Sequence, residues 1–255
     1  MKTLQTVGLG TMGIDDPATI ETAIEVGYRH LDTAKVYGNE DVVGEGIDRS
    51  GIDREDLFVA TKLWIDDLAY DDAIHATKEA LDRLDLETVD LLYVHRPRGN
   101  YDPADTLPAL DDLRDRGWIQ HVGVSNFEVP QLETAREHLD APIVANQVEY
   151  HPLFQPTDAL ADAREHDYSL VAYSPLANGR AGEIPEVVDI AEKHDVAPET
   201  VPLAWLVAKD NVVTIPKASS EAHLRANLEA AGVALDPADH DRLDGIERED
   251  ELFPE

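Results

Sequence analysis

Residues 57–95, LFVATKLWIDDLAYDDAIHATKEALDRLDLETVDLLYVH, carry the pattern that decides the fold. The stretch begins with a short apolar run (57–62) and ends with another (89–95), and both have the length and composition of buried strands. Between them lies an amphipathic helix, whose apolar face consists of Ile74, Ala76, Ala80, Leu81 and Leu84. A strand, a helix and a second strand in this order predict a βαβ unit with parallel strands.

The same alternation runs through the whole chain. Eight segments have the character of strands: 6–10, 29–33, 57–62, 89–95, 119–126, 142–148, 169–174 and 212–216. Eight such units favour an α/β fold of the closed (β/α)8 TIM barrel type, although the count alone leaves a doubly wound sheet open. We therefore expect a single barrel domain over residues 1–255. The stretch 184–210 is longer than one crossover needs, so we also expect an extra helix there.

The composition is strongly acidic and lacks cysteine. Asp and Glu number 53 against 21 Lys and Arg, which gives a formal net charge of -32 at pH 7. This charge disfavours binding to nucleic acid or to an anionic membrane, and its spread over the predicted helices is typical of a halophilic protein. Without cysteine the chain has no disulfide, thiolate metal site or cysteine nucleophile. It has no apolar run of about 18 residues and no signal-peptide pattern, so we expect a cytoplasmic protein.

Polar side chains close most of the predicted strands. In a (β/α)8 barrel the carboxyl ends of the strands form the active-site face, so these side chains converge from distant parts of the chain. Only seven lysines occur, and two of them end apolar strands, where a solvated charge is not expected. The strand-closing residues are Asp32, Lys62, His95, Ser125, Asn126, Gln147, Tyr173, Ser174 and Lys217.

Each of these residues also has an ordinary structural interpretation. Asp32 is suited to cap a helix, and His95 to form a hydrogen bond at a strand end. Asn126 and Gln147 are suited to bond loop backbone groups, and Tyr173 to lie in the core with its hydroxyl at the surface. Because seven of eight strands would need unrelated reasons to end in such groups, the set as a whole favours a functional site.

Several segments resemble, in order, those of the aldo-keto reductase family. GYRHLDTAKVYGNEDVVG (27–44) is similar to the first signature of the family, and VATKLW (59–64) and LYVHRP (92–97) are similar to two further segments. GVSNF, NQVEYHP, YSPL and TIPKAS continue in the order of the family. The resemblance spans nearly the whole chain and is nearest to microbial reductases of small aldehydes and keto-sugar acids. It implies an oxidoreductase that uses NAD(P)H to reduce aldehydes and ketones to alcohols.

The resemblance implies a catalytic tetrad of Asp32, Tyr37, Lys62 and His95. Tyr37 would be the general acid, and we expect the ammonium of Lys62 to lower its pKa from the usual value of about 10. Asp32 would pair with Lys62, while His95 would donate a hydrogen bond to the carbonyl of the substrate. Trp64 and His95 would line the substrate pocket, and the mechanism needs no metal.

The resemblance also implies where the nicotinamide cofactor binds. Ser125, Asn126 and Gln147 would hold the carboxamide, and the nicotinamide ring would stack on Tyr173. The glycine-rich stretch 8–13 would approach the ribose, although a tight turn explains its glycines equally well. The full predicted set is Gly10, Thr11, Met12, Ser125, Asn126, Gln147, Tyr173, Ser174, Leu176, Lys217, Ser219, His223 and Asn227.

The segment that would bind the adenosine phosphate departs from the family pattern. Lys217 is present, but Ala218 stands at the usual serine, and His223 stands where an arginine is expected. Arg225 follows two residues later. A bidentate arginine is thereby lost, and neutral histidine is a poor replacement. We expect NADPH as the cofactor, with NADH as the alternative.

The C-terminal segment after the last predicted barrel helix (236–255) is short. It leaves little chain for the long loop that encloses bulky substrates in some relatives. We therefore expect an open pocket, with Trp64 and Met12 supplying the apolar walls.

Two other functions fit part of this pattern. In a Schiff-base enzyme Lys62 would be the nucleophile, but a neighbouring Asp32 would raise its pKa when such a lysine needs a lowered one. A nicotinamide-binding regulatory barrel would share the fold, but it has no chemical need for Tyr37 and His95 beside Lys62. The expected partner is a small-molecule carbonyl substrate rather than nucleic acid or membrane, and we expect a monomer.

Overall fold

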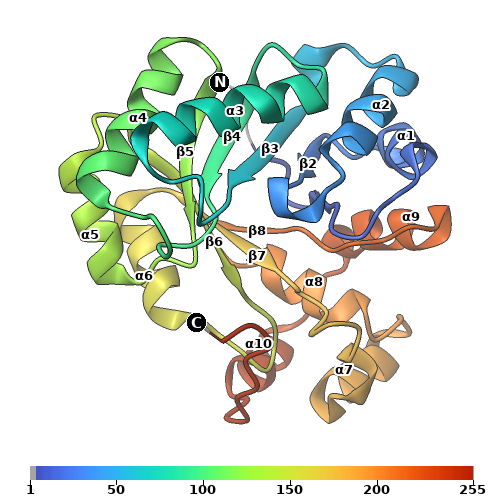
Figure 1. Ribbon diagram of the computed structural model, residues 1–255. Coiled ribbons are helices and arrows are strands. Elements are labelled where there is room, and N and C mark those ends of the chain that lie inside the picture. The colour runs from blue at the N-terminus through green and yellow to red at the C-terminus, as the bar shows by residue number, and fades with distance from the viewer. Residues whose placement is uncertain (1–3, 255) are drawn as a thin grey trace.

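Residues 4–254 are described by a computed structural model, so the predicted domain extends beyond the described residues by residues 1–3 and 255. Eight parallel strands form one sheet in sequence order (Figure 1). Thr214, the last residue of β8, pairs in a parallel bridge with Val7, which precedes β1, and the Gly8 amide donates to the Thr214 carbonyl at 2.8 Å. These contacts close the sheet, and the predicted (β/α)8 barrel is confirmed.

All eight predicted strands are present, some of them shorter than expected. Their bounds are β1 (Leu9–Gly10), β2 (His30–Asp32), β3 (Phe58–Leu63), β4 (Val89–Val94), β5 (Ile119–Ser125), β6 (Ile143–Glu149), β7 (Ser169–Tyr173) and β8 (Val212–Thr214).

Helices surround the barrel, and two of them lie between β7 and β8, which confirms the expected extra helix. The helix bounds are α1 (Pro17–Val26), α2 (Glu40–Ser50), α3 (Tyr70–Leu84), α4 (Pro103–Asp115), α5 (Val129–His138), α6 (Thr157–His166), α7 (Pro185–His194), α8 (Thr200–Val207), α9 (Glu221–Glu229) and α10 (Pro237–Asp244). Among the described residues, no helix has the length and apolar character needed to cross a membrane.

The alternation of side chains along the strands positions the functional groups. On β3, Phe58 and Ala60 belong to the apolar cluster inside the barrel, whereas Val59 and Leu63 belong to the larger cluster beneath the helices. Because successive strand residues point to opposite faces, Lys62 shares the inward face of Phe58 and Ala60, at the carboxyl end of the strand. The fold thus carries a lysine into the mouth of the barrel.

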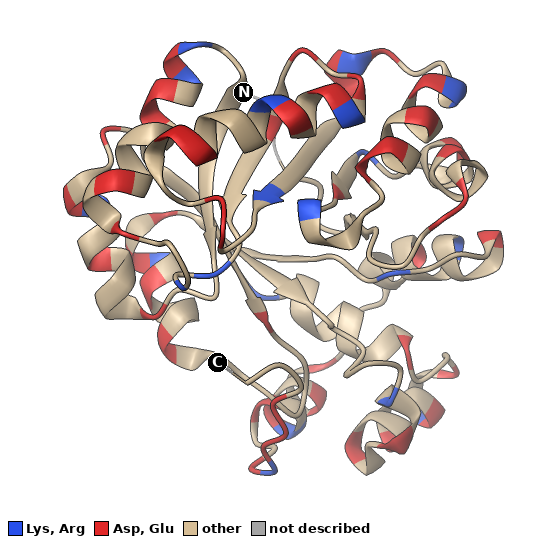
Figure 2. Ribbon diagram, viewed as in Figure 1, with Lys and Arg blue, Asp and Glu red and all other residues tan. Residues whose placement is uncertain are grey.

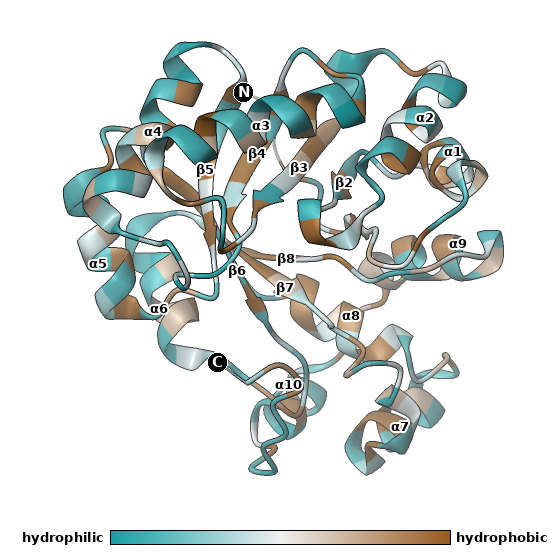
Figure 3. Cartoon of the chain, viewed as in Figure 1, coloured by the Kyte–Doolittle hydropathy of each residue, from teal (hydrophilic) through white to brown (hydrophobic). Residues whose placement is uncertain are grey.

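Charge and hydropathy follow the same arrangement. Apolar residues concentrate on the central strands, while the hydrophilic residues cover the outer helices (Figure 3). Acidic residues are spread over the outer helices and their loops rather than gathered in one region (Figure 2). This distribution matches the interpretation of the negative charge as a property of the whole surface.

Candidate active site

A cleft of about 700 Å³ opens at the carboxyl ends of the strands, a size typical of small-molecule sites. Most of the predicted site residues line it. These are Gly10, Thr11, Met12, Asp32, Tyr37, Trp64, His95, Asn126, Gln147, Tyr173, Ser174, Leu176 and Lys217. Lys62 and Ser125 are buried, with 1% of each residue exposed, and both bond to residues of the lining.

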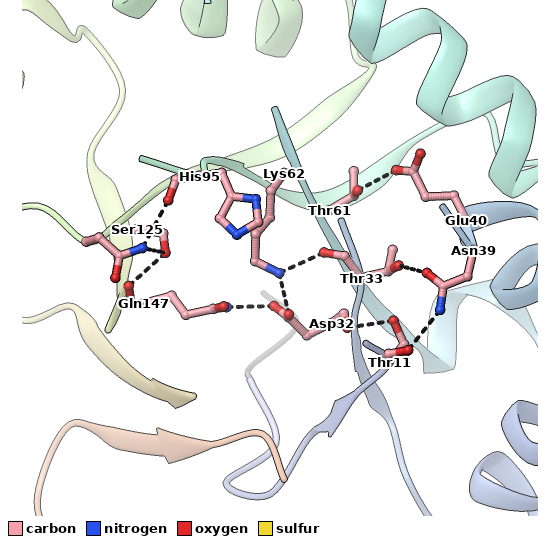
Figure 4. Close-up of polar contacts among 11 residues, drawn as sticks. Thr11, Asp32, Thr33, Asn39, Glu40, Thr61, Lys62, His95, Ser125 and Gln147 are labelled. Carbon is pink, nitrogen blue, oxygen red and sulfur yellow. Dashed lines mark hydrogen bonds and ion pairs between the residues drawn. The ribbon is translucent and has the colours of Figure 1, made fainter. Parts of the chain in front are cut away.

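A buried ion pair lies at the base of this cleft (Figure 4). The Lys62 ammonium donates to a carboxylate oxygen of Asp32 and to the Thr33 carbonyl, the latter at 2.7 Å. The second carboxylate oxygen of Asp32 accepts from the Gln147 amide at 2.7 Å. Asp32 therefore neutralises a buried lysine, and Ala34 rather than Asp32 occupies the cap position of the helix that follows.

Tyr37 lies above this pair, from the short 3-10 helix Lys35–Tyr37. The Lys62 Nζ atom is 5.1 Å from the centre of the Tyr37 ring. Burial tends to lower the pKa of Lys62, but the charge of Asp32 and the contact with Tyr37 outweigh it and raise this pKa above its usual value. Lys62 is therefore an ammonium at neutral pH.

The pKa of Tyr37 moves in the direction opposite to the expected one. Burial raises this pKa above its usual value of about 10, and the lowering effect of Lys62 only partly opposes burial. The sequence indicates the nearby ammonium of Lys62, but it does not indicate how much water the fold removes from around the Tyr37 ring. Tyr37 thus retains its proton at neutral pH.

His95 faces Tyr37 and Trp64 across the cleft. Its ring centre is 6.0 Å from that of Tyr37 and 5.0 Å from that of Trp64, both in edge-to-face geometry. Burial and the nearby charge of Lys62 lower the pKa of His95 to about 2, so the imidazole is neutral. Its Nδ1 atom is buried and has no hydrogen-bond partner within the described chain.

Amide and hydroxyl groups from three strands form the neighbouring wall. Asn126 donates to the Ser125 hydroxyl at 3.0 Å and to the His95 carbonyl at 3.1 Å, and it accepts from the Tyr173 hydroxyl at 3.0 Å. Asn126 and Ser174 adopt left-handed backbone conformations, with φ of 60° and 50°. Such conformations cluster at functional sites because the surrounding structure has to enforce them.

The glycine-rich stretch 8–13 has clear structural duties. A Cβ atom at Gly10 would come within 2.7 Å of the Ile215 carbonyl oxygen, so this glycine permits the close approach that seals the barrel. Gly13 has a φ of 74° in a turn where the Ile14 amide bonds the Thr11 carbonyl at 2.9 Å. The tight-turn interpretation is therefore correct, and it leaves Gly10, Thr11 and Met12 on the lining of the cleft.

Sequence reasoning missed the residue that supports this region from behind. The Asn39 amide donates to the Thr11 and Ile14 carbonyls at 2.8 and 2.9 Å, and its oxygen accepts from the Thr33 hydroxyl at 3.2 Å (Figure 4). It thereby joins the loop after β1 to the end of β2. Asn39 lies within the quoted segment 27–44, but no strand-end pattern marks it.

The predicted adenosine-phosphate residues are less closely gathered. Lys217 is exposed and lines the cleft, whereas Ser219, His223 and Asn227 are absent from its lining. Asn227 is buried on α9. Arg225, which follows the missing arginine position, donates to a carboxylate oxygen of Glu221 at 2.8 and 2.9 Å. Its guanidinium is therefore already engaged with a carboxylate.

The C-terminal segment contributes a wall to the cleft that the sequence did not predict. Phe253 lines the cleft, and its ring centre is 5.8 Å from that of Tyr173. The short segment reaches the cleft because it turns back from α10 toward β6 (Figure 1). No local pattern in the sequence indicates this path.

Across residues 4–254, no group of three or more histidine, aspartate or glutamate side chains is arranged to hold a metal ion. The cleft instead offers amide, hydroxyl and aromatic groups beside a lysine. These are groups suited to an uncharged heterocycle and a carbonyl.

Comparisons with known proteins agree with the geometry. Residues 6–248 match the family model described as the aldo/keto reductase family. The chain is 35% identical to methylglyoxal reductase DkgB of Escherichia coli O157:H7, covering 96% of this chain and 94% of that protein. It is 34% identical to glyoxal reductase of Bacillus subtilis (strain 168), covering 97% and 90%. The solved structure of MGS-M4, an aldo-keto reductase from a deep-sea metagenome library of the Medee basin, superposes with a TM-score of 0.94 at 31% identity, covering 100% and 95%.

Proposed function

The chain belongs to the aldo/keto reductase family, and from this premise we propose how its cleft reduces a small carbonyl compound. It is an NAD(P)H-dependent oxidoreductase that converts an aldehyde or ketone to an alcohol. The observation that carries the assignment of roles is the buried Asp32–Lys62 pair directly beneath Tyr37.

The proposed proton donor is the Tyr37 hydroxyl. Because burial keeps this group protonated, it holds a proton until negative charge develops on the carbonyl oxygen. The fixed positive charge of Lys62 then stabilises the tyrosinate that remains, and Asp32 keeps that charge in place. Lys62 and Asp32 thus act on Tyr37 rather than on the substrate.

His95 is proposed to orient the carbonyl. A neutral imidazole carries one N–H donor, and its lowered pKa ensures that this donor does not compete with Tyr37 as an acid. The edge-to-face contacts with Tyr37 and Trp64 fix the plane of the ring. The carbonyl oxygen would therefore lie between the Tyr37 hydroxyl and His95.

The residues of the cleft fit a nicotinamide group. Asn126 and Gln147 supply amide groups, Ser125 supplies a hydroxyl, and Tyr173 presents an aromatic ring on the same side. When bound, the reduced nicotinamide supplies the hydride that adds to the carbonyl carbon. The chain contributes the position of the carboxamide, the position of the substrate and the proton.

We propose NADPH as the preferred cofactor, with weak discrimination against NADH. Lys217 is exposed and lines the cleft, and its ammonium makes no ion pair within residues 4–254, so it can bind a 2'-phosphate. The engagement of Arg225 with Glu221 and the presence of Ala218 remove the other groups that would strengthen such a contact. One lysine without a bidentate partner supports a modest preference.

The substrates that we propose are small aldehydes, in particular α-oxoaldehydes. The relatives named above reduce methylglyoxal and glyoxal by their names, and both compounds are small. Here Trp64 and Phe253 contribute aromatic walls to the cleft, which favours compact substrates over bulky ones. Keto-sugar acids are the second class to test.

We also propose that the enzyme works in a salt-rich cytoplasm as a monomer. Its net charge of -32 and the spread of acidic residues over the outer helices support the salt-rich setting, because salt screens the repulsion that opposes compaction (Figure 2).

The Schiff-base alternative has less support. A lysine that attacks a carbonyl must lose its proton, whereas Asp32 raises the pKa of Lys62 and the Thr33 carbonyl accepts one of its hydrogens.

The test is a reductase assay in concentrated potassium chloride, which follows the absorbance of reduced nicotinamide with methylglyoxal, glyoxal and simple aldehydes. NADPH and NADH are supplied separately. We expect turnover with both cofactors and a higher kcat/KM with NADPH. Binding of the cofactor without turnover across the panel would instead favour a regulatory barrel.

A further inference from the structure

One buried carboxylate of the barrel has no part in the proposed chemistry. Glu149 is the last residue of β6 and is 3% exposed. One of its carboxylate oxygens accepts from the backbone amide of Leu252 at 2.7 Å, and the other accepts from the backbone amide of Phe253 at 3.0 Å. A buried carboxylate thus binds two consecutive amides of a segment more than a hundred residues away in the sequence.

A neighbouring histidine fixes the orientation of this carboxylate. His151 Nε2 lies 2.8 Å from the Glu149 oxygen that also accepts from the Leu252 amide. His151 Nδ1 accepts from the Leu153 amide at 3.2 Å. Because Nδ1 accepts, the ring hydrogen lies on Nε2 and is donated to Glu149. Glu149 therefore has three donors and a fixed geometry.

We call residues 248–253 the C-terminal strap, and further contacts attach it along its length. Arg248 makes a two-pronged ion pair with Glu186 on α7, at 2.9 and 2.6 Å. Asp250 accepts from Arg180 at 2.8 Å, and its amide donates to the Leu153 carbonyl at 2.8 Å. The strap is thus attached to β6, to the loop after β7 and to α7.

The strap ends on the aromatic ring of the cleft. Phe253 packs edge-to-face on Tyr173, with an interplanar angle of 74°. On its other side Tyr173 is held through its hydroxyl by Asn126. The ring is therefore restrained by a polar contact within the barrel and by an apolar contact from the strap.

We propose that Glu149 is a positioning residue that seats Phe253 against Tyr173 and thereby prearranges the nicotinamide site. This inference rests on the proposed function, because it takes Tyr173 as the ring that contacts the nicotinamide. A ring that is already held in its binding orientation loses less freedom when the cofactor binds. Glu149 contributes to cofactor affinity in this way although it touches neither cofactor nor substrate.

The experiment measures the Kd of NADPH for the full-length protein in concentrated salt, from the quenching of tryptophan fluorescence. The variants are Glu149→Gln, Phe253→Ala and the double variant, with Glu133→Gln as the control. Glu133 is exposed on α5, so the control removes the same charge at a distance from the strap. Phe253→Ala changes a half-buried residue near the end of the chain, so it tests the proposal even if Glu149→Gln fails to fold.

We expect each single variant to raise the Kd about 2- to 10-fold, the range that an aromatic pair contributes. The Kd of the double variant should be no higher than that of the single variant with the higher Kd, because Glu149 acts through Phe253. Hydrogen exchange at the Leu252 and Phe253 amides should become faster in Glu149→Gln, and Phe253→Tyr, which keeps the ring, should restore the affinity lost in Phe253→Ala.

Three results would overturn the proposal. The Kd could stay unchanged in Phe253→Ala, the two single effects could add in the double variant, or the strap amides could be released in Glu149→Gln without loss of affinity. Each of these leaves the proposed reductase function intact, provided that the wild type binds NADPH. If the wild type binds neither NADPH nor NADH, both this inference and the proposed function are wrong.

Discussion

Replacement of Asp32 by asparagine tests the buried ion pair, because it keeps the shape of the side chain and removes its charge. Asp32 and Lys62 are each 1% exposed, so water cannot compensate the ammonium that remains. Removing one partner of a buried pair costs about 3–5 kcal/mol of unfolding free energy. This cost has an upper limit, because Lys62 can lose its proton, and the loss of stability cannot exceed the free energy needed to deprotonate it.

This upper limit depends on pH, because the free energy of deprotonating Lys62 falls as the pH rises. With a reference pKa of about 10.4, deprotonating a lysine costs about 4.5 kcal/mol at about pH 7 and about 2 kcal/mol at about pH 9. In wild type the raised pKa of Lys62 contributes stability that is fully present below about pH 10.4 and is lost only above it, so this contribution stays flat between these two values. In folded Asp32→Asn we expect the pKa of Lys62 to lie below its value in the unfolded chain. The unfolded state then binds more protons than the folded state, so the stability of the variant rises with pH.

The assay is urea unfolding followed by tryptophan fluorescence in concentrated potassium chloride, at about pH 7 and about pH 9. We expect Asp32→Asn to lose about 3–4.5 kcal/mol at the lower pH and no more than about 2 kcal/mol at the higher pH. Asp241→Asn, an exposed position on α10, removes the same charge and should change little at either pH. An Asp32→Asn deficit of equal size at both pH values would refute the reasoning.

Three further predictions concern acid, cofactor and salt. Burial lowers the pKa of His30 to about 4, so wild type should lose up to about 3 kcal/mol of unfolding free energy from this group as pH falls from about 6.5 to about 4, and His30→Gln should lose correspondingly less in acid urea titrations. Lys217→Met should weaken NADPH binding about 10- to 100-fold and NADH binding less than about 2-fold in fluorescence titrations; equal losses would remove Lys217 from the phosphate site. Raising potassium chloride from about 0.1 M to about 1 M should raise the thermal unfolding midpoint, because the Debye length falls from about 10 Å to about 3 Å, and a lower midpoint would contradict the halophilic interpretation.

Much of the fold and of the cleft could be predicted because the signals are local. The apolar run 57–62 ends in Lys62, which predicts a lysine at the carboxyl end of a strand, and the same strand-end position brings His95 and Gln147 to the same face. The same logic holds for the eight strands, whose apolar runs are separated by helical spacing.

The features that could not be predicted depend on the path of the chain in three dimensions. The position of Phe253 depends on two backbone amides that donate to Glu149, and no pattern in the sequence links Glu149 to Phe253. The direction of the Tyr37 pKa shift depends on how much water the fold removes, which no spacing of residues reveals. Asn39 joins two loops through contacts that become apparent only when those loops meet.

The central claim is that Tyr37 donates the proton, and Tyr37→Phe tests it most directly because the ring is kept and only the hydroxyl is removed. Reduction of methylglyoxal is measured with saturating NADPH, and the Kd of NADPH is measured by fluorescence in the same buffer. We predict a fall in kcat of about 100- to 10000-fold, the contribution typical of a general acid, with the Kd changed by less than about 3-fold. Undiminished turnover in this variant would contradict the account and transfer the proton donor to another group of the cleft.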